Sequence, residues 1–295
     1  MAKQAKPTGA LFGIPAFFCE NLALGAEDDA APGLSPARVC FALVMIGLGI
    51  VGLISGDFAG VWQHLPIKDL PGQKILAYLC AALELAAGIG LLLAPVLTLT
   101  SRVLFFYMTL WVVLLKLPAV ILVPYIEGTW SACGEIVVIM AGAWVLYAQH
   151  AGAWDKAKLG WAVGKRGVRN ARLLLAPAIA LCGLAHLVYS EFTAPFIPDW
   201  IPFHMFWVIL TGSAGILAGF GILFGVFARL AATLEAAMLG VITLLVWGPH
   251  VAAEPLSLNQ WTAFLISSAI AVGAWLVADT YRGAPWFALG NPKSE

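Results

Sequence analysis

Eight long apolar segments, separated by short polar stretches, constrain the fold of this chain more than any other feature of its sequence. Each is close to the length of about 17–25 residues that a helix needs to cross the hydrocarbon core of a bilayer. Because the segments are continuously apolar and do not alternate, they predict helices and not the strands of a membrane barrel. They run approximately over residues 39–55, 75–97, 103–121, 130–148, 173–189, 203–224, 230–247 and 261–278.

The composition agrees with a membrane environment. Hydrophobic residues make up 61% of the 295 residues and charged residues only 11%, against about 25% charged residues in soluble domains. A soluble protein of this size needs a more polar exterior than these residues can supply. The formal net charge is +0, and without a basic patch no nucleic-acid partner is expected. We therefore expect an all-α, polytopic membrane protein whose first partner is the lipid bilayer.

The metal-ligating residue types are scattered. No two of the five cysteines lie within four residues of each other, so neither a CxxC redox motif nor a zinc-ligand spacing is present. The histidines also lack the i, i+4 spacing of a helical metal site. We predict no metal site, and the cysteines are interpreted as small buried hydrophobic residues. The cysteines are Cys19, Cys40, Cys80, Cys133 and Cys182.

The two halves of the chain repeat with a period of about 130 residues. Each half holds four apolar segments, an even number, so the two copies should have the same orientation in the membrane. This predicts two parallel four-helix units related by an axis normal to the membrane, in contrast to the inverted repeats of many transporters. The matching features are residues 84–92 with 215–223, Arg102 with Arg229, and Leu117-Pro118 with Gly248-Pro249.

The repeat and the distribution of polar residues predict the domain organisation. An N-terminal cytoplasmic tail covers residues 1–35, and a short C-terminal tail covers the end of the chain. A basic cytoplasmic linker joins the two four-helix units. The predicted ranges are 36–150 for the first unit, 151–171 for the linker, 172–285 for the second unit and 286–295 for the C-terminal tail.

The second half resembles the DoxX-like family of small four-helix bacterial membrane proteins, and the first half shows a weaker version of the same pattern. Here the family's unit would be present as a tandem duplication. The resemblance is carried by Pro198-Asp199-Trp200-Ile201-Pro202, Trp207, Thr211-Gly212, the glycine-rich stretch 217–222 and Arg229.

The resemblance implies a function in redox systems of the bacterial cytoplasmic (inner) membrane. Members of the family include a subunit of thiosulfate:quinone oxidoreductase and partners in oxidative-stress complexes. A quinone is thus the implied cofactor class, and partner subunits or a homo-oligomer are the implied assembly. The family has no defined catalytic motif, so the resemblance assigns no catalytic residue and leaves open whether the chain is an enzyme.

Three charged residues inside the apolar segments form the candidate site: Glu84, Lys116 and Glu135. They lie on successive helices at overlapping depths and should face the interior of the first unit, because isolated charges in the membrane core are costly. Since one lysine between two carboxylates leaves a surplus negative charge, one glutamate is expected to hold a proton. The cluster is either a proton relay or quinone anchor, or a structural ion pair that fixes helix packing.

His186 and Glu235 are the weaker candidates, and both lie in the second half. Gly215 and Trp247 occupy the positions that match Glu84 and Lys116, so the sequence does not duplicate the charged cluster. His186 is interpreted either as a functional group or as a hydrogen-bonded residue at a helix end, and Glu235 as a buried acid or one that reaches the interface.

Three functions fit these observations. The first is a subunit of a redox-associated, quinone-linked membrane system, which would take electrons from a partner because the sequence shows no haem-ligand pair or nucleotide fingerprint. The second is a small-solute or proton-coupled transporter that uses the charged cluster. The third is a structural subunit that packs against a larger complex through its glycine-rich faces.

We predict that both termini and the linker around Lys165 are cytoplasmic. Thirteen of the 16 Lys and Arg residues fall on the side of the N-terminus, whereas only Lys68 and Lys74 fall on the other side and Lys116 lies within a helix. Positive charges in short loops remain on the cytoplasmic side during insertion. A cysteine introduced at position 165 should resist a membrane-impermeant thiol reagent in intact cells, while one at position 68 should react. Strong labelling at position 165 would contradict this topology.

Overall fold

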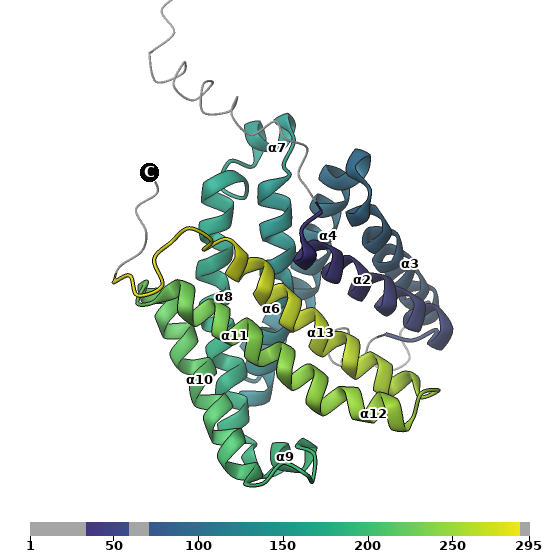
Figure 1. Ribbon diagram of the computed structural model, residues 1–295. Helices are drawn as coiled ribbons and strands as arrows, with labels where there is room; N and C mark the ends of the chain where they lie inside the picture. Colours follow the sequence, from purple (N-terminus) through teal and green to yellow (C-terminus); the bar gives the residue numbers. More distant parts are fainter. Residues whose placement is uncertain (1–33, 59–70, 290–295) are drawn as a thin grey trace, which may run out of the picture. The chain divides into compact units, whose positions relative to one another are not determined.

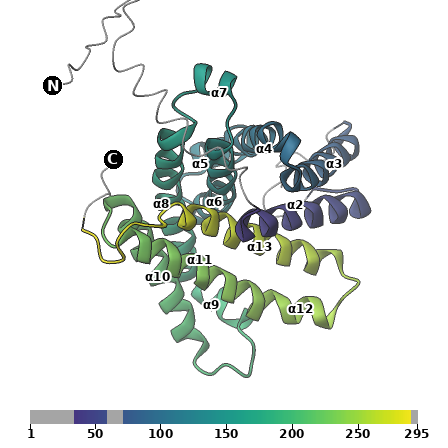
Figure 2. The same ribbon diagram turned by 45° about the horizontal axis from the view of Figure 1, so that its top comes forward.

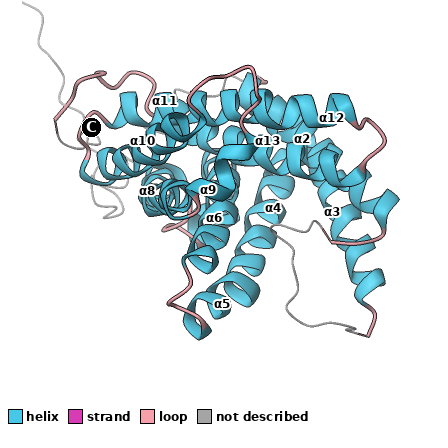
Figure 3. Ribbon diagram, turned by 90° about the horizontal axis from the view of Figure 1, so that it is seen from below, coloured by secondary structure: helices cyan, strands magenta, loops and turns pink. Residues whose placement is uncertain are grey.

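The computed structural model describes residues 34–58 and 71–289, which form helices joined by loops with no strand among them (Figure 3). Eight helices in this part are long and apolar enough to cross a membrane, which confirms the predicted all-α, multi-pass membrane fold. The predicted tails lie largely outside the described residues, at 1–33 and 290–295. The first four spans are α2 (Pro36–Ser55), α3 (Gln73–Leu92), the composite span Ala94–Leu122 and α6 (Glu127–Gln149).

The second half shows the same order of spans. The short helix α7 (Ala153–Lys158) lies between the halves, and α9 (Ser190–Thr193) with the 3₁₀ turn η3 (Ala194–Phe196) follows the fifth span. The spans of this half are α8 (Gly164–Val188), α10 (His204–Phe224), the composite span Ala228–Ala253 and α13 (Leu258–Asp279).

The first helix of the second half begins earlier than the hydropathy predicts. α8 starts at Gly164, inside the predicted linker, and its first turns carry Lys165, Arg166, Arg169 and Arg172. Hydropathy detects only the part of a helix that lies in hydrocarbon. These long basic side chains can extend from the helix end towards the headgroup region, so the helix continues where the apolar segment has stopped.

The third span of each half is interrupted at the same place by a π-helical turn, which the sequence analysis did not predict. In the first half η1 (Ala94–Val96) and α4 (Leu97–Trp111) precede the π turn η2 (Val112–Lys116), and α5 (Leu117–Leu122) follows it. In the second half α11 (Ala228–Ile242) precedes η4 (Thr243–Trp247), and α12 (Gly248–Ala253) follows it.

A proline explains each π turn. Pro118 and Pro249 stand two residues after the turns, and a proline ring clashes with the carbonyl four residues earlier in a regular helix. Those carbonyls belong to Leu114 and Leu245, in the middle of the turns. Widening the helix there removes the clash, and the amide after each turn bonds five residues back, Leu117 N–H to the carbonyl of Val112 and Gly248 N–H to that of Thr243.

The spanning helices make a closed series of contacts. Each packs against the next one along the chain, and α13 packs against α2, so that the series returns to its start. Figures 1 and 2 show α13 with α2 on one side and α11 with α12 on the other. The contact of α13 with α2 matches the contact of α6 with α8 in the repeat. The last helix of each half thus packs against the first helix of the other half.

The last helices of the two halves, α6 and α13, also contact each other directly and cross in Figure 1. They meet at Gly142 and Gly273, which are separated by the same number of residues as the two π turns. A Cβ added to Gly142 would lie 2.6 Å from the Cα of Gly273. Small residues allow membrane helices to approach this closely and to gain van der Waals contact between their backbones.

In each half, an arginine near the start of the third span contacts the segment that follows the fourth span. Arg102 donates to Asp155 at 2.6 Å and lies over the ring of Trp154 at 5.2 Å. Arg229 donates to the carbonyl of Ala284 at 2.6 Å and lies over Trp286 at 4.0 Å. A guanidinium stacked on an aromatic face gains electrostatic attraction from the ring, so these contacts fix the end of each unit.

Asp155 of the first arginine contact is fully buried. Burial by itself would raise the pKa of its carboxyl group, but hydrogen bonds from Arg102, from the Tyr147 hydroxyl at 2.8 Å and from the Gly152 backbone N–H outweigh this effect. The pKa is therefore held below its ordinary value, because all of these donors favour the charged carboxylate.

We predict that Gly142→Ala lowers the thermal stability of the protein, because its Cβ has no space against α13. Overpacking of this kind costs about 1–3 kcal/mol. The matched control is Gly248→Ala, since a Cβ at Gly248 meets no atom within 4 Å. Thermal unfolding of the purified proteins in detergent should show a lower midpoint for Gly142→Ala alone. Equal midpoints for the two variants would contradict the close approach of α6 and α13.

Candidate functional site

Glu84 lies in the interior of the first half. Its side chain is 2% exposed, because α3 packs closely against α2: a Cβ at Gly88 would lie 2.7 Å from the carbonyl oxygen of Ala42. The Tyr107 hydroxyl of α4 donates a hydrogen bond to Glu84 Oε1 at 2.8 Å. A hydrogen bond to a carboxylate is stronger than one between neutral groups, and it holds the carboxyl group in one orientation.

Tyr107 is the functional side chain that the sequence analysis missed. It is buried, and its ring packs edge-on against Trp111, which in turn packs against Phe58. The thiol of Cys80, one helical turn before Glu84, lies near the Tyr107 hydroxyl. The sequence held one signal for this role, a tyrosine in an otherwise apolar stretch of α4. The hydroxyl of a buried tyrosine usually has a hydrogen-bond partner, so such a residue is a candidate for a buried polar site.

A small cavity reaches the buried carboxyl group. Its volume is about 20 Å³, and its wall includes Glu84 of α3, Thr262 of α13, and Ser55 with Asp57 at the end of α2. A polar cavity of this size can hold about one water molecule. Glu84 and the polar groups at the end of α2 therefore line the same small cavity.

Lys116 is the last residue of the π turn η2 and is buried, at 7% exposure. Its charge interacts with Glu135 of α6, and Glu135 also experiences the charge of Glu127 at the start of that helix. Lys116 and Glu135 are thus near enough to interact electrostatically, and the predicted cluster as a whole stays a prediction. The direct pairing of Glu84 with Lys116 stays a prediction.

Glu235 occupies a place in the second half that is related to the place of Glu84. It is buried in α11, and its Oε1 lies 3.6 Å from the position that a Cβ on Gly215 of α10 would take. Gly215 is the residue that matches Glu84 in the repeat. A carboxyl group therefore lies between the second and third spans of both halves, supplied by the second span in one half and by the third span in the other.

Cys182 lies on α8, which packs against both α6 and α10. Both Glu135 and Glu235 are near enough to interact electrostatically with its thiol, and its sulfur lies 3.4 Å from the position of a Cβ on Gly134. The absence of a side chain at Gly134 lets α8 approach α6, and this brings Cys182 close to the two acids. Sequence spacing could not reveal this grouping, because its members come from three separate spans.

His186 lies half-buried on α8, and its Nδ1 is 3.0 Å from the Thr211 hydroxyl of α10. Thr211 donates in turn to the carbonyl of Trp207. This contact links the first two spans of the second half, which favours the structural interpretation of His186. Within residues 34–58 and 71–289, no three histidine, cysteine, aspartate or glutamate side chains are grouped so that they could hold a metal ion.

Comparison with protein-family models, with curated proteins and with solved structures finds no match to this chain. The chemistry of the site must therefore be inferred from its own geometry.

We predict that Tyr107→Phe destabilises the protein, because it removes a donor from the buried carboxyl group of Glu84. Loss of one such hydrogen bond costs about 0.5–1.5 kcal/mol. Replacing both groups, in the double variant Tyr107→Phe with Glu84→Leu, should restore much of the thermal stability. Tyr125→Phe is the control, because Tyr125 is 84% exposed. Thermal midpoints in detergent that do not differ between the Tyr107 and Tyr125 variants would contradict this role.

Proposed function

We propose that this multi-pass membrane protein is a subunit of a quinone-linked redox system and exchanges protons at Glu84. The observation that carries the proposal is the hydrogen-bonded pair of Glu84 and Tyr107, buried beside a cavity that leads to Ser55 and Asp57. An ionisable residue inside a membrane is costly to keep, and such residues commonly mark ion or proton pathways.

Quinone chemistry supplies a reason for such a site. Reduction of a quinone consumes protons as well as electrons, and its ring lies in or near the hydrocarbon core, where water does not deliver protons freely. A carboxyl group with a tyrosine partner and room for about one water molecule can deliver them. The electrons would come from a partner protein. The resemblance to the DoxX-like family supports this assignment.

The proposal includes the bacterial cytoplasmic (inner) membrane as the location, with both termini in the cytoplasm. The family resemblance supports this membrane as the location. The distribution of Lys and Arg supports the orientation of the termini. The exposed apolar side chains of the eight spans among the described residues would face lipid.

Proton-coupled transport of a small solute is the second candidate. The π turns at matching positions of the two halves favour it, because π turns are local irregularities that often occur at functional sites. Two halves with a deformable third span could move relative to each other around a site between them. The carboxyl groups of Glu84 and Glu235 at related interfaces would then take up and release the coupled protons.

We expect Glu84→Gln to reduce proton-coupled activity by about 100-fold or more, because it removes the exchangeable proton while keeping the size of the side chain. The full chain would be purified in mild detergent with the proteins that accompany it, and quinone reduction by this complex would be measured. Glu191→Gln is the control, since Glu191 is exposed on α9. Quinone reduction unchanged by Glu84→Gln would eliminate the proposal.

Two further results separate the alternatives. Proton uptake that depends on a solute in liposomes containing the chain alone would establish the transporter. For a structural subunit, Glu84→Gln should lower stability and partner activity together. The double variant Glu84→Leu with Lys116→Leu should then restore both. For a functional site, the same double variant should be stable but inactive.

A further inference from the structure

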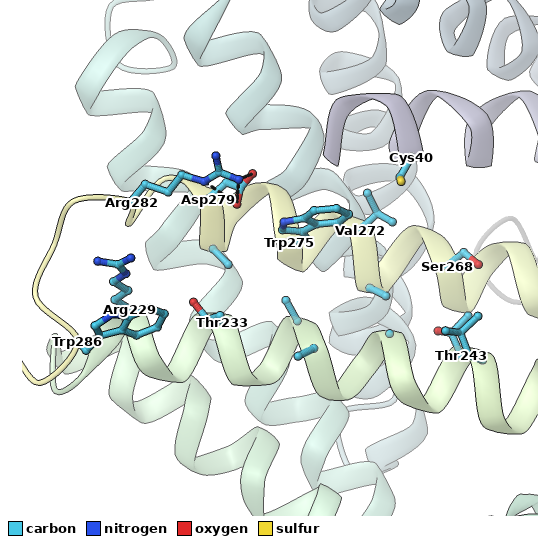
Figure 4. Close-up of a pocket in the computed structure, with 16 residues that line it drawn as sticks. Cys40, Arg229, Thr233, Thr243, Ser268, Val272, Trp275, Asp279, Arg282 and Trp286 are labelled. Atoms are coloured by element: carbon cyan, nitrogen blue, oxygen red, sulfur yellow. Dashed lines mark hydrogen bonds and ion pairs between the residues drawn. The ribbon is translucent and has the colours of Figure 1, made fainter. Parts of the chain in front are cut away.

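A groove with a volume of about 580 Å³ lies between α11 and α13 (Figure 4). One end is polar and lies where α11 begins and α13 ends. The other end lies within the span, at the hydroxyl groups of Thr243 and Ser268. At 1.5 Å of rise per residue, the groove extends about 21 Å along α11. It therefore follows α11 from the first turn of this helix to the π turn η4.

Small side chains create the groove. α11 contributes Ala236, Ala237 and Gly240, and α13 contributes Ala271 and Val272. A Cβ added to Gly240 would meet no atom within 4 Å. The resulting channel is long and apolar, and these dimensions suit an extended hydrocarbon chain.

The polar end carries one positive charge that no carboxylate compensates among the described residues. Arg282 is bound through two nitrogens to Asp279, which makes this pair neutral. Arg229, by contrast, bonds to the carbonyl of Ala284 and stacks on Trp286, and neither partner carries a charge. The guanidinium is thereby fixed at the mouth of the groove, with its charge available to an anion.

The deep end of the groove has few hydrogen-bonding groups available to a ligand. The Thr243 hydroxyl donates to the carbonyl of Leu239 and lies 2.7 Å from the hydroxyl of Ser267, and the Ser268 hydroxyl donates to the carbonyl of Phe264. The hydrogen-bonding capacity of Thr243 and Ser268 is thus largely used within the protein. A ligand in the groove is expected to place its charged group at Arg229 and its apolar end near these two residues.

We propose that the groove binds one acyl chain of an anionic phospholipid, with the lipid phosphate at Arg229. Basic pockets between membrane helices recognise anionic headgroups in this way, and an arginine fork binds phosphate through paired hydrogen bonds. A quinone fits less well, because its neutral headgroup leaves the charge of Arg229 uncompensated.

Native mass spectrometry of the full chain tests this proposal, with phosphatidylglycerol and phosphatidylcholine of identical acyl chains as probes. Wild type should retain phosphatidylglycerol preferentially. Arg229→Gln should weaken this binding by about tenfold or more, whereas Arg282→Gln should not, because its charge is already paired. Gly240→Leu, whose side chain would fill the groove, should lose the lipid without losing the fold. Gly248→Leu is its control, since Gly248 is equally open but lies outside the groove.

Three results would overturn the proposal: equal retention of the two lipids by wild type, full lipid retention by Gly240→Leu, or a quinone that displaces phosphatidylglycerol from wild type. The last result would assign the groove to a neutral ligand. Because the Gly240→Leu variant leaves the contacts of Arg229 in place, the proposal can be tested even if Arg229→Gln fails to fold.

Discussion

The close contact of α6 and α13 at Gly142 and Gly273 determines how the rest of the spans can be arranged. In lipid, helices do not gain by hiding apolar surface from each other, so association depends on close packing of backbones and small side chains. These two helices end the two halves of the chain, and each packs against the first helix of the other half. The halves are thereby joined at this contact and at the two contacts between a last and a first helix.

The buried carboxyl groups show how a membrane protein can retain polar residues in a low-dielectric interior. A charged side chain at the centre of a bilayer is unfavourable by about 2.5–3.5 kcal/mol or more. Glu84 accepts a hydrogen bond from the Tyr107 hydroxyl, and the half-buried Glu135 has Lys116 near enough to interact electrostatically. Glu235 lies against a glycine and has Cys182 nearby. Each acid thus has a different neighbour, and these neighbours distinguish the two halves chemically.

The two halves share their framework but not their site. The π turns, the glycine contact and the arginine that stacks on a tryptophan recur at matching positions. The carboxyl group between the second and third spans also recurs, but the helix that supplies it differs. A groove with an arginine at its mouth is found beside α11. The framework therefore depends on backbone packing, which repeats, whereas the chemistry depends on individual side chains, which do not.

The sequence by itself determined the number of spans, their approximate bounds and the three charged residues inside the first unit. These features depend on hydropathy and on the bilayer thickness, which act on each segment separately. Only the tertiary structure decided that Tyr107 is the partner of Glu84, that Glu235 points towards the position equivalent to Glu84, and that α11 and α13 leave a groove. Such contacts depend on the rotation of each helix about its axis, and in lipid that rotation is set by packing against neighbouring helices and not by the sequence of one segment.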